Sequence, residues 1–181
     1  MSRKILVVPH NPQWAEMFAG EAKLVASALG PNVIAVHHIG STAIPTIHAK
    51  PVIDMLIEVA NVDAIDACNP AMEVLGYEPR GEFGIPGRRF FRKDDAAGIR
   101  THHIHAFAAG SPQIERHLAF RDFLLVHPDW AGRYSDLKRR LADAHPDSIE
   151  LYMDGKDAFI KQVDQLAAAN MANIDINQLP R

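Results

Sequence analysis

The chain has 181 residues, of which 48% are hydrophobic and 23% charged, a composition that excludes a disordered protein and predicts one domain with a sizeable core. Its 19 basic and 22 acidic side chains leave a formal net charge of -3, so general nucleic-acid binding and attraction to an anionic membrane are not expected. The single cysteine excludes an intramolecular disulfide framework. Because no apolar run reaches the length of a signal peptide or a membrane span, we expect a cytoplasmic protein without a membrane partner.

The first 110 residues predict a mixture of helices and strands. A helix is expected over 12–30, where Asn11 can cap the start and apolar residues recur at helical spacing. A second helix, disturbed by Pro70, is expected over 62–75. Strands of an antiparallel or mixed sheet are expected over the runs 33–39, 51–59, 77–79, 88–92 and 101–107.

The rest of the chain predicts helices. Proline residues and cap residues mark starts at Ser111, His127 and Asp147, and the segment 173–181 shows no clear period. The fold class is therefore α+β, a mixed sheet with flanking helices and a helical C-terminal part. We expect a single domain over residues 1–170, sheet-rich over 1–110 and helical over 111–170, followed by a tail at 171–181.

A glycine-serine turn, Gly40-Ser41, leaves the run 33–39, and Asp54 follows inside the next apolar run. Glycine has no Cβ, so backbone amide groups at such a turn can approach a phosphate closely. A carboxylate inside an apolar strand calls for a metal ion, a cation or a hydrogen-bond donor. Together the two features can hold a nucleoside triphosphate and its divalent cation. Alternatively, the turn is only a turn and Asp54 is a structural acid paired with Lys50 or an arginine.

Two histidines alternate in the run 101–107. His103 and His105 point to one face of the expected strand, and His102 and Ile104 to the other. With Asp54 they predict a metal site of two nitrogens and one carboxylate, a set that favours zinc, manganese or iron over magnesium. Asp54 and His105 are the candidate catalytic residues. The alternative is that both histidines are polar groups bonded to water or to Asp54.

Basic residues form two further patterns. Five of them lie between 78 and 94 around glycines, as in a loop that closes over a triphosphate or in a solvated hairpin. Lys138 and Lys156 each follow a tyrosine by four residues. That spacing can pair a stacking ring with a phosphate-binding ammonium group. We favour the other interpretation, in which the lysine stems lie along the core and their charged ends reach solvent.

Motifs along most of the chain resemble the signature of the GrpB family, a branch of the nucleotidyltransferase-fold superfamily. They are HIGSTAIP at 38–45, AKPVID at 49–54, GRRFFRK at 87–93, RTHHIH at 100–105, FRDFL at 120–124, YSDLK at 134–138 and YMDGK at 152–156. The resemblance implies a nucleotidyltransferase-like sheet and a small nucleotide or coenzyme-like ligand, since some members are joined to dephospho-CoA kinase. It places this ligand on Gly40, Ser41, Thr42, Lys50, Arg88 and Arg121. It also implies a divalent metal ion, magnesium or manganese with the nucleotide, or else zinc.

One departure from the wider superfamily bears on the reaction. Nucleotidyltransferases of this fold carry a second acid two residues after the first, and here that position is Leu56. Glu58 would lie about 13 Å from Asp54 along the strand, too far to serve the same ion. Three hypotheses remain: nucleotidyl transfer to a small acceptor, nucleotide binding without transfer, and metal-dependent hydrolysis on Asp54, His103 and His105.

Overall fold

The computed structural model describes residues 4–177, with side chains as far as Met171. Its strands are β1 Val33–Ile39, β2 Ile53–Val59, β3 Tyr77–Pro79, β4 Arg89–Asp94 and β5 Arg100–Ala108. Its α-helices are α1 Gln13–Leu29, α2 Asn69–Val74, α3 Pro112–Val126, α4 Pro128–Ala144 and α5 Ile149–Asn177. Three short 3₁₀ turns, η1 Gly30–Asn32, η2 Ser41–Ala43 and η3 Asp63–Cys68, connect some of them.

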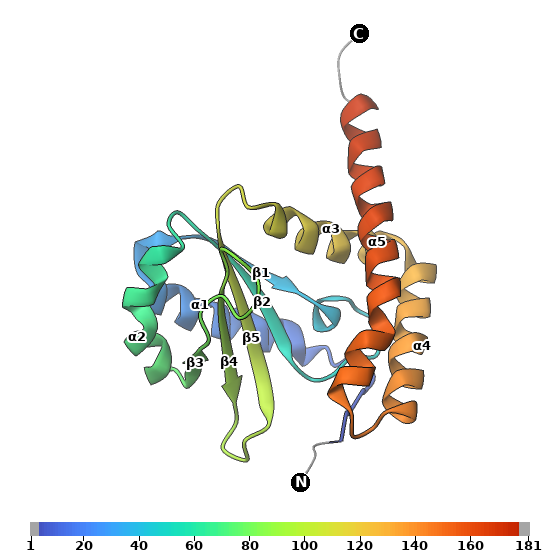
Figure 1. Cartoon of the computed structure of the whole chain (residues 1–181), viewed down its shortest axis with the longest axis horizontal. Helices are drawn as coiled ribbons and strands as arrows, with labels where there is room; N and C mark the ends of the chain where they lie inside the picture. Colours follow the sequence, from blue (N-terminus) through green and yellow to red (C-terminus); the bar gives the residue numbers. More distant parts are fainter. Residues whose placement is uncertain (1–3, 178–181) are drawn as a thin grey trace.

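The five strands form one mixed sheet in the order β1-β2-β5-β4-β3. Strands β2 and β5 are parallel neighbours at its centre, and the other pairs are antiparallel. In Figure 1 the sheet stands between α1 and α2 on one side and the helices α3, α4 and α5 on the other. The architecture confirms the predicted α+β class.

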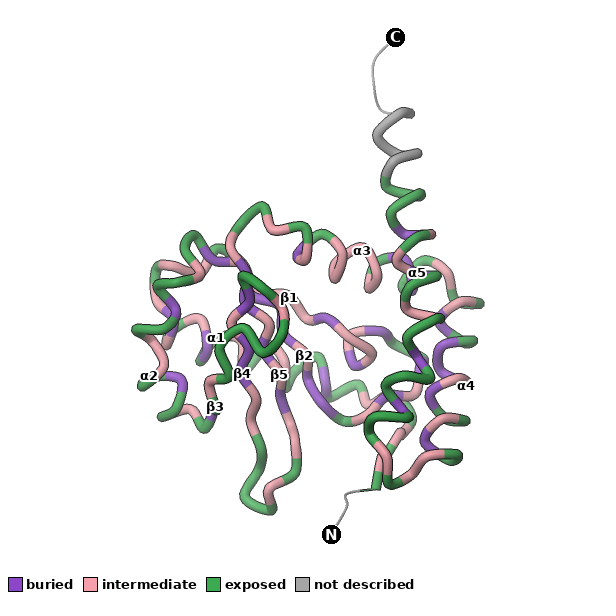
Figure 2. The backbone as a smooth tube through the Cα atoms, viewed as in Figure 1, coloured by how far each residue is buried: buried purple, intermediate pink, exposed green. Residues whose placement is uncertain are grey.

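One face of the sheet makes the main core. Apolar residues of β2 and β5 alternate toward α1 and α2, so that Met55, Ile57 and Ile104 are fully buried there with Trp14 and Val25 of α1. This alternation is visible along β5 in Figure 2, where buried residues are interleaved with half-buried ones. The interleaved residues, which include His103 and His105, therefore belong to the opposite face of the sheet.

The C-terminal helices make a second core. Ile44 and Ile47, from the loop after β1, pack with Leu124 of α3, Tyr134 of α4 and Val163 of α5. This loop is thus held between the sheet and the helical layer. Helix α5 continues past the rest of the fold, as Figure 1 shows.

Two predicted segments differ from the structure. The expected helix over 62–75 is a 3₁₀ turn followed by α2, because Pro70 lies in the first turn of α2 and starts it rather than interrupting it. The expected tail at 171–181 is wrong as far as Asn177, since α5 extends to that residue and no proline or glycine interrupts it there. Residues 178–181 lie outside the described part. No helix of the described chain is long and apolar enough to cross a membrane.

Candidate functional site

A cleft of about 580 Å³ lies between the second face of the sheet and the helical layer. Its lining includes almost all of the predicted site residues, namely Gly40, Ser41, Thr42, Lys50, Asp54, Arg88, His103 and His105. Helices α3, α4 and α5 complete it with Arg116, His117, Tyr134, Lys138, Tyr152 and Lys156. Among the described residues, five lysine or arginine side chains line this cleft, whereas Asp54 is the one acid.

The glycine-serine turn and the aspartate meet at the end of the β1–β2 pair. Ile39 is the register partner of Asp54, so Gly40 follows directly beside the carboxylate. Gly40 has a φ of 72°, and a Cβ built there would lie 2.6 Å from Asp54 Oδ2. Only glycine accommodates both the positive φ and this close approach. The turn and Asp54 therefore lie in contact, as predicted, because Gly40 has no side chain that would displace the carboxylate.

Asp54 and His103 are neighbours because β2 and β5 are parallel and in register at these residues. His103 Nδ1 lies 3.1 Å from Asp54 Oδ1 and donates its proton, since a carboxylate only accepts. Arg100 donates to the other ring nitrogen of His103 over 3.3 Å. Burial by itself would raise the pKa of Asp54, but the His103 hydrogen bond and the electrostatic influence of His103, His105 and Lys50 outweigh it and hold that pKa below its ordinary value.

His105 is held differently. Its Nδ1 lies 3.3 Å from Arg88 Nη1 and accepts a hydrogen bond from it, so in the neutral ring the proton is on Nε2. Burial, with the charge of Arg88 adding to it, lowers the pKa of His105 to about 4, so the ring is neutral at physiological pH. His105 can therefore donate a hydrogen bond from Nε2. To act as a base or a metal ligand at Nε2 it would need the other tautomer, which the Arg88 bond opposes.

The sequence resemblance implies a divalent metal ion at this site, and the donor set does not match one. The second-acid position is Leu56, a fully buried residue whose register partner is His105. Within the described chain, no group of three or more His, Cys, Asp or Glu side chains is placed so that it could hold a metal ion. The metal site on Asp54, His103 and His105 thus stays a prediction without a preformed ligand set. A two-metal centre needs several carboxylates, and the described lining of this cleft supplies one.

Lysines from the helical layer reach into the cleft instead. Lys138 Nζ donates to Ser41 Oγ over 2.7 Å and also to the carbonyl oxygen of His48. Its ammonium group lies 4.5 Å from the centre of the Tyr134 ring. Burial and repulsion by Lys156 lower the pKa of Lys138 to about 7. The amino group of Lys138, a residue far along the chain, therefore lies directly at the glycine-serine turn.

Lys50 and Lys156 extend this cluster around Tyr152. Their ammonium groups lie 5.4 Å and 4.6 Å from the centre of its ring. Burial lowers the pKa of Lys156 to about 8, with repulsion by Lys50 in the same direction and Asp54 opposing it. Burial also lowers the pKa of Lys50, which Asp54 partly offsets. Lys156 thus lies close enough to interact with both Lys50 and Lys138, and Lys50 and Lys156 also interact with Asp54.

The lysine interpretation favoured from the sequence is wrong. Only 2% of Lys138 and 8% of Lys156 is exposed, so both side chains are buried at the cleft and do not extend over the protein surface. The repeated spacing of tyrosine and lysine was the signal that could have identified them, and it does pair each ammonium group with its ring. Arg116 and His117 also line the cleft, and neither was among the predicted site residues.

Three predicted phosphate-binding residues have their polar groups engaged within the protein. Thr42 is buried, and its hydroxyl donates to the Val52 carbonyl and lies 2.9 Å from His38 Nε2. Arg121 does not line the cleft, because its guanidinium donates to the His38 carbonyl and pairs with Asp122. Arg88 lines the cleft but also bonds to two carbonyl groups of the loop before it, those of residues 82 and 83.

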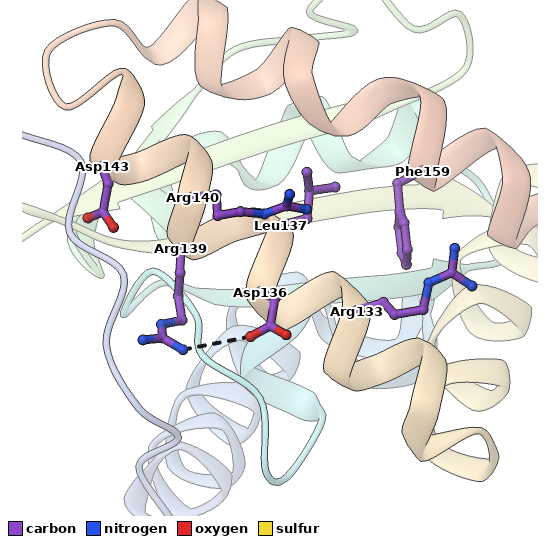
Figure 3. A pocket seen from close by; sticks show the side chains of 7 residues that line it. All are labelled: Arg133, Asp136, Leu137, Arg139, Arg140, Asp143 and Phe159. Atoms are coloured by element: carbon purple, nitrogen blue, oxygen red, sulfur yellow. Dashed lines mark ion pairs between the residues drawn. The ribbon is translucent and has the colours of Figure 1, made fainter.

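A second hollow lies on the other side of α4, between that helix and α5 (Figure 3). Its lining residues are Arg133, Asp136, Leu137, Arg139, Arg140, Asp143 and Phe159. Arginines and aspartates alternate here, and Arg139 lies 3.7 Å from Asp136 in an ion pair. None of the sequence-predicted site residues lies in it, so the cleft over the sheet is the candidate site.

Comparison with known proteins places the chain in a family. The GrpB family model, described as GrpB protein, matches residues 4–166. The UPF0157 protein YqkA of Bacillus subtilis is 48% identical over 165 residues, which cover 91% of this chain and 48% of YqkA. The chain thus spans about half the length of this relative. The crystal structure of the conserved protein GrpB from Enterococcus faecalis has 43% identity and a TM-score of 0.87, covering 92% of this chain and 99% of that chain.

More distant structures share the fold alone. The structure of the GLD-2/RNP-8 complex has a TM-score of 0.53 and 12% identity, covering 80% of this chain and 58% of that chain. The structural neighbours are nucleotidyltransferase-fold proteins, so the fold implied by the sequence resemblance is confirmed. Since the family match covers most of the chain and includes the turn, Asp54 and both histidines, the chain belongs to the GrpB family.

Proposed function

We propose that the cleft binds a nucleotide or another small ligand that carries several phosphate groups. The observation that supports this most strongly is the charge of the described lining, five lysine or arginine side chains against the single carboxylate of Asp54. Buried cations are costly unless something of opposite charge pairs with them. A polyphosphate supplies several negative charges in one ligand, and ammonium and guanidinium groups are its ordinary partners in proteins.

The arrangement of the lysines agrees with such a ligand. Lys138 lies at the Gly40-Ser41 turn, and Lys156 and Lys50 lie near the Tyr152 ring, so all three line the same cleft. Burial, with repulsion by a neighbouring lysine adding to it, lowers the pKa values of Lys138 and Lys156, and a bound anion would relieve that repulsion. A volume of about 580 Å³ is within the range of small-molecule sites.

Transfer of a nucleotidyl group to a small acceptor is the reaction we propose for a bound nucleoside triphosphate. The acceptor oxygen would attack the α-phosphorus while the bond to pyrophosphate breaks, and the acceptor proton would pass to the carboxylate of Asp54. The lysines would stabilise the negative charge that collects on the leaving pyrophosphate. The proposal of nucleotidyl transfer rests on the fold and on the position of Asp54 beside the turn.

A thermal-shift titration with ATP, GTP, CTP, UTP and coenzyme A tests the binding proposal, with each ligand added in the presence and absence of magnesium. We expect at least one of them to raise the melting temperature of the wild type and to have a much smaller effect on Lys156→Met. Lys161→Met, an exposed lysine of the same helix, is the matched control. No stabilisation by any of these ligands would refute the binding proposal.

Release of pyrophosphate separates an enzyme from a binding module. A screen of hydroxyl- and amine-bearing acceptors with the stabilising nucleotide is expected to release pyrophosphate with the wild type and not with Asp54→Asn. Binding without release by any acceptor would support a module that holds the nucleotide without transferring it.

A further inference from the structure

An apolar core residue, Leu56, occupies the position at which nucleotidyltransferases of this fold carry their second acid. Leu56 is fully buried, and it packs with Ile39, Phe107 and Ile114 between the sheet and α3. A carboxylate at this position would be buried in apolar surroundings, which is energetically costly. The fold therefore does not accommodate a second metal-binding acid there. The remaining acid, Asp54, already accepts a hydrogen bond from His103.

Three lysines line the same cleft as Asp54, where a polyphosphate would need its charge neutralised. Lys138 Nζ is 2.7 Å from Ser41 Oγ, at the turn that precedes Asp54. Lys50 and Lys156 both lie over the Tyr152 ring. Both are also near enough to Asp54 for its negative charge to raise their pKa values against the effect of burial. These three lysines come from the loop before β2, from α4 and from α5, so the fold brings them together from separate elements.

We propose that Lys50, Lys138 and Lys156 neutralise the polyphosphate of the ligand in place of a divalent cation, so that the cleft binds the metal-free ligand. This inference rests on the proposed function and specifies the form of its ligand. A divalent cation on the polyphosphate would cancel part of the negative charge that the ligand offers to a cleft whose described lining holds five cationic side chains and one carboxylate. The metal-free form has more negative charge and gains more from the same lysines.

The role of Asp54 reverses under this proposal. In a metal-centred site, Asp54 holds the ion, and its loss abolishes binding of the metal complex. In a lysine-centred site, its negative charge repels the phosphates and draws the charge of Lys50 and Lys156 toward itself. The substitution Asp54→Asn, which keeps the shape of the side chain, therefore changes affinity in opposite directions in the two cases.

Isothermal titration calorimetry with inorganic triphosphate and with ATP tests the proposal, each in EDTA and in excess magnesium. We expect the wild type to bind both in EDTA at least as tightly as in magnesium. Lys156→Met is expected to weaken binding in EDTA by about ten-fold or more. Asp54→Asn is expected to bind the metal-free ligands as tightly as the wild type or more tightly. Lys161→Met is the control on the same helix, and circular dichroism confirms that each variant is folded.

Two results would overturn the inference, and they are distinguishable. Binding that needs magnesium or manganese and disappears in Asp54→Asn would establish a metal-centred site, and the proposed function would stand without the lysine mechanism. Absence of binding by triphosphate, ATP and the other nucleotides, with and without metal, would refute the proposed function itself. Lys156 is chosen over Lys138 because Lys138 also bonds to the His48 carbonyl and its loss disturbs the loop as well as the cleft.

Discussion

Asp54 occupies the space in which a side chain of residue 40 would lie, since a Cβ on Gly40 would be 2.6 Å from Asp54 Oδ2. Gly40 also has a φ of 72°. Gly40→Ala must therefore displace the carboxylate and strain the turn, and we expect it to lower the free energy of unfolding by about 1–3 kcal/mol. It should also weaken binding of the stabilising nucleotide.

Urea unfolding and calorimetry measure the two effects. Gly30→Ala is the matched control, because Gly30 has a similar φ of 69° and a Cβ added to it would meet no atom of the described chain within 4 Å. We expect Gly30→Ala to cost stability through strain alone and to leave ligand binding unchanged. Equal binding by Gly40→Ala and the wild type would show that the contact with Asp54 does not shape the site.

Two buried lysines predict an unusual dependence of stability on pH. Burial lowers the pKa of Lys138 to about 7 and that of Lys156 to about 8, with repulsion by Lys156 adding to the first shift and repulsion by Lys50 to the second. In the unfolded chain both pKa values are about 10.4, so between these values the unfolded state binds more protons. Stability therefore rises with pH from about 7 toward 10, by up to about 1.4 kcal/mol per pH unit for each lysine.

Urea unfolding of the ligand-free protein between pH 7 and 9.5 measures this rise. Lys156→Met is expected to be more stable than the wild type at pH 7, because it removes a charge that burial disfavours, and to show a smaller rise with pH. Lys161→Met, with its exposed side chain, should follow the wild type. If the free energy of unfolding of the wild type stayed constant or fell over this pH range, the claim that burial and repulsion lower the pKa values of these lysines would be contradicted.

Buried histidines predict a loss of stability in acid. Burial lowers the pKa of His105 to about 4 and that of His117 to about 3, with nearby arginines adding to the effect. In the unfolded chain they protonate near 6.5, so the unfolded state binds more protons below that pH and the free energy of unfolding falls as pH decreases from 6.5 toward 4. His117→Gln should flatten this fall in urea unfolding. His145→Gln, at the end of α4, is the comparison, and an equal effect of both substitutions would contradict the prediction.

Arg88 joins the loop before β4 to the cleft. Its guanidinium donates to the carbonyl oxygens of Glu82 and Phe83 and to Nδ1 of His105. A lysine cannot make this set of bonds, because its ammonium group lacks the planar fork of donors. Arg88→Lys is therefore expected to speed amide hydrogen exchange in residues 81–87 and to leave exchange in β2 unchanged. Arg92→Lys, whose arginine pairs with Glu78 of the neighbouring strand, is the control; unchanged exchange in Arg88→Lys would show that this loop is held by other contacts.

The sequence by itself determined the features that depend on neighbouring residues. The strand over 33–39 has the predicted limits, and β5 presents His103 and His105 to the same face because side chains alternate along any strand. The association of Gly40 with Asp54 also follows from a turn and a strand that lie close together in the chain. Family membership could likewise be inferred from local motifs, and the family match confirms it.

Only the tertiary structure decided what faces these residues. Lys138 and Ser41 are 97 residues apart in the chain, and their contact depends on how α4 packs over the turn. Whether a lysine four residues after a tyrosine reaches solvent or a cleft depends on what covers it, which helical spacing does not specify. The proton position on His105 was likewise decided by Arg88, which approaches from the loop before β4. Hydrogen bonds and burial between distant segments set charge and protonation, so the chemistry of the cleft was decided by packing.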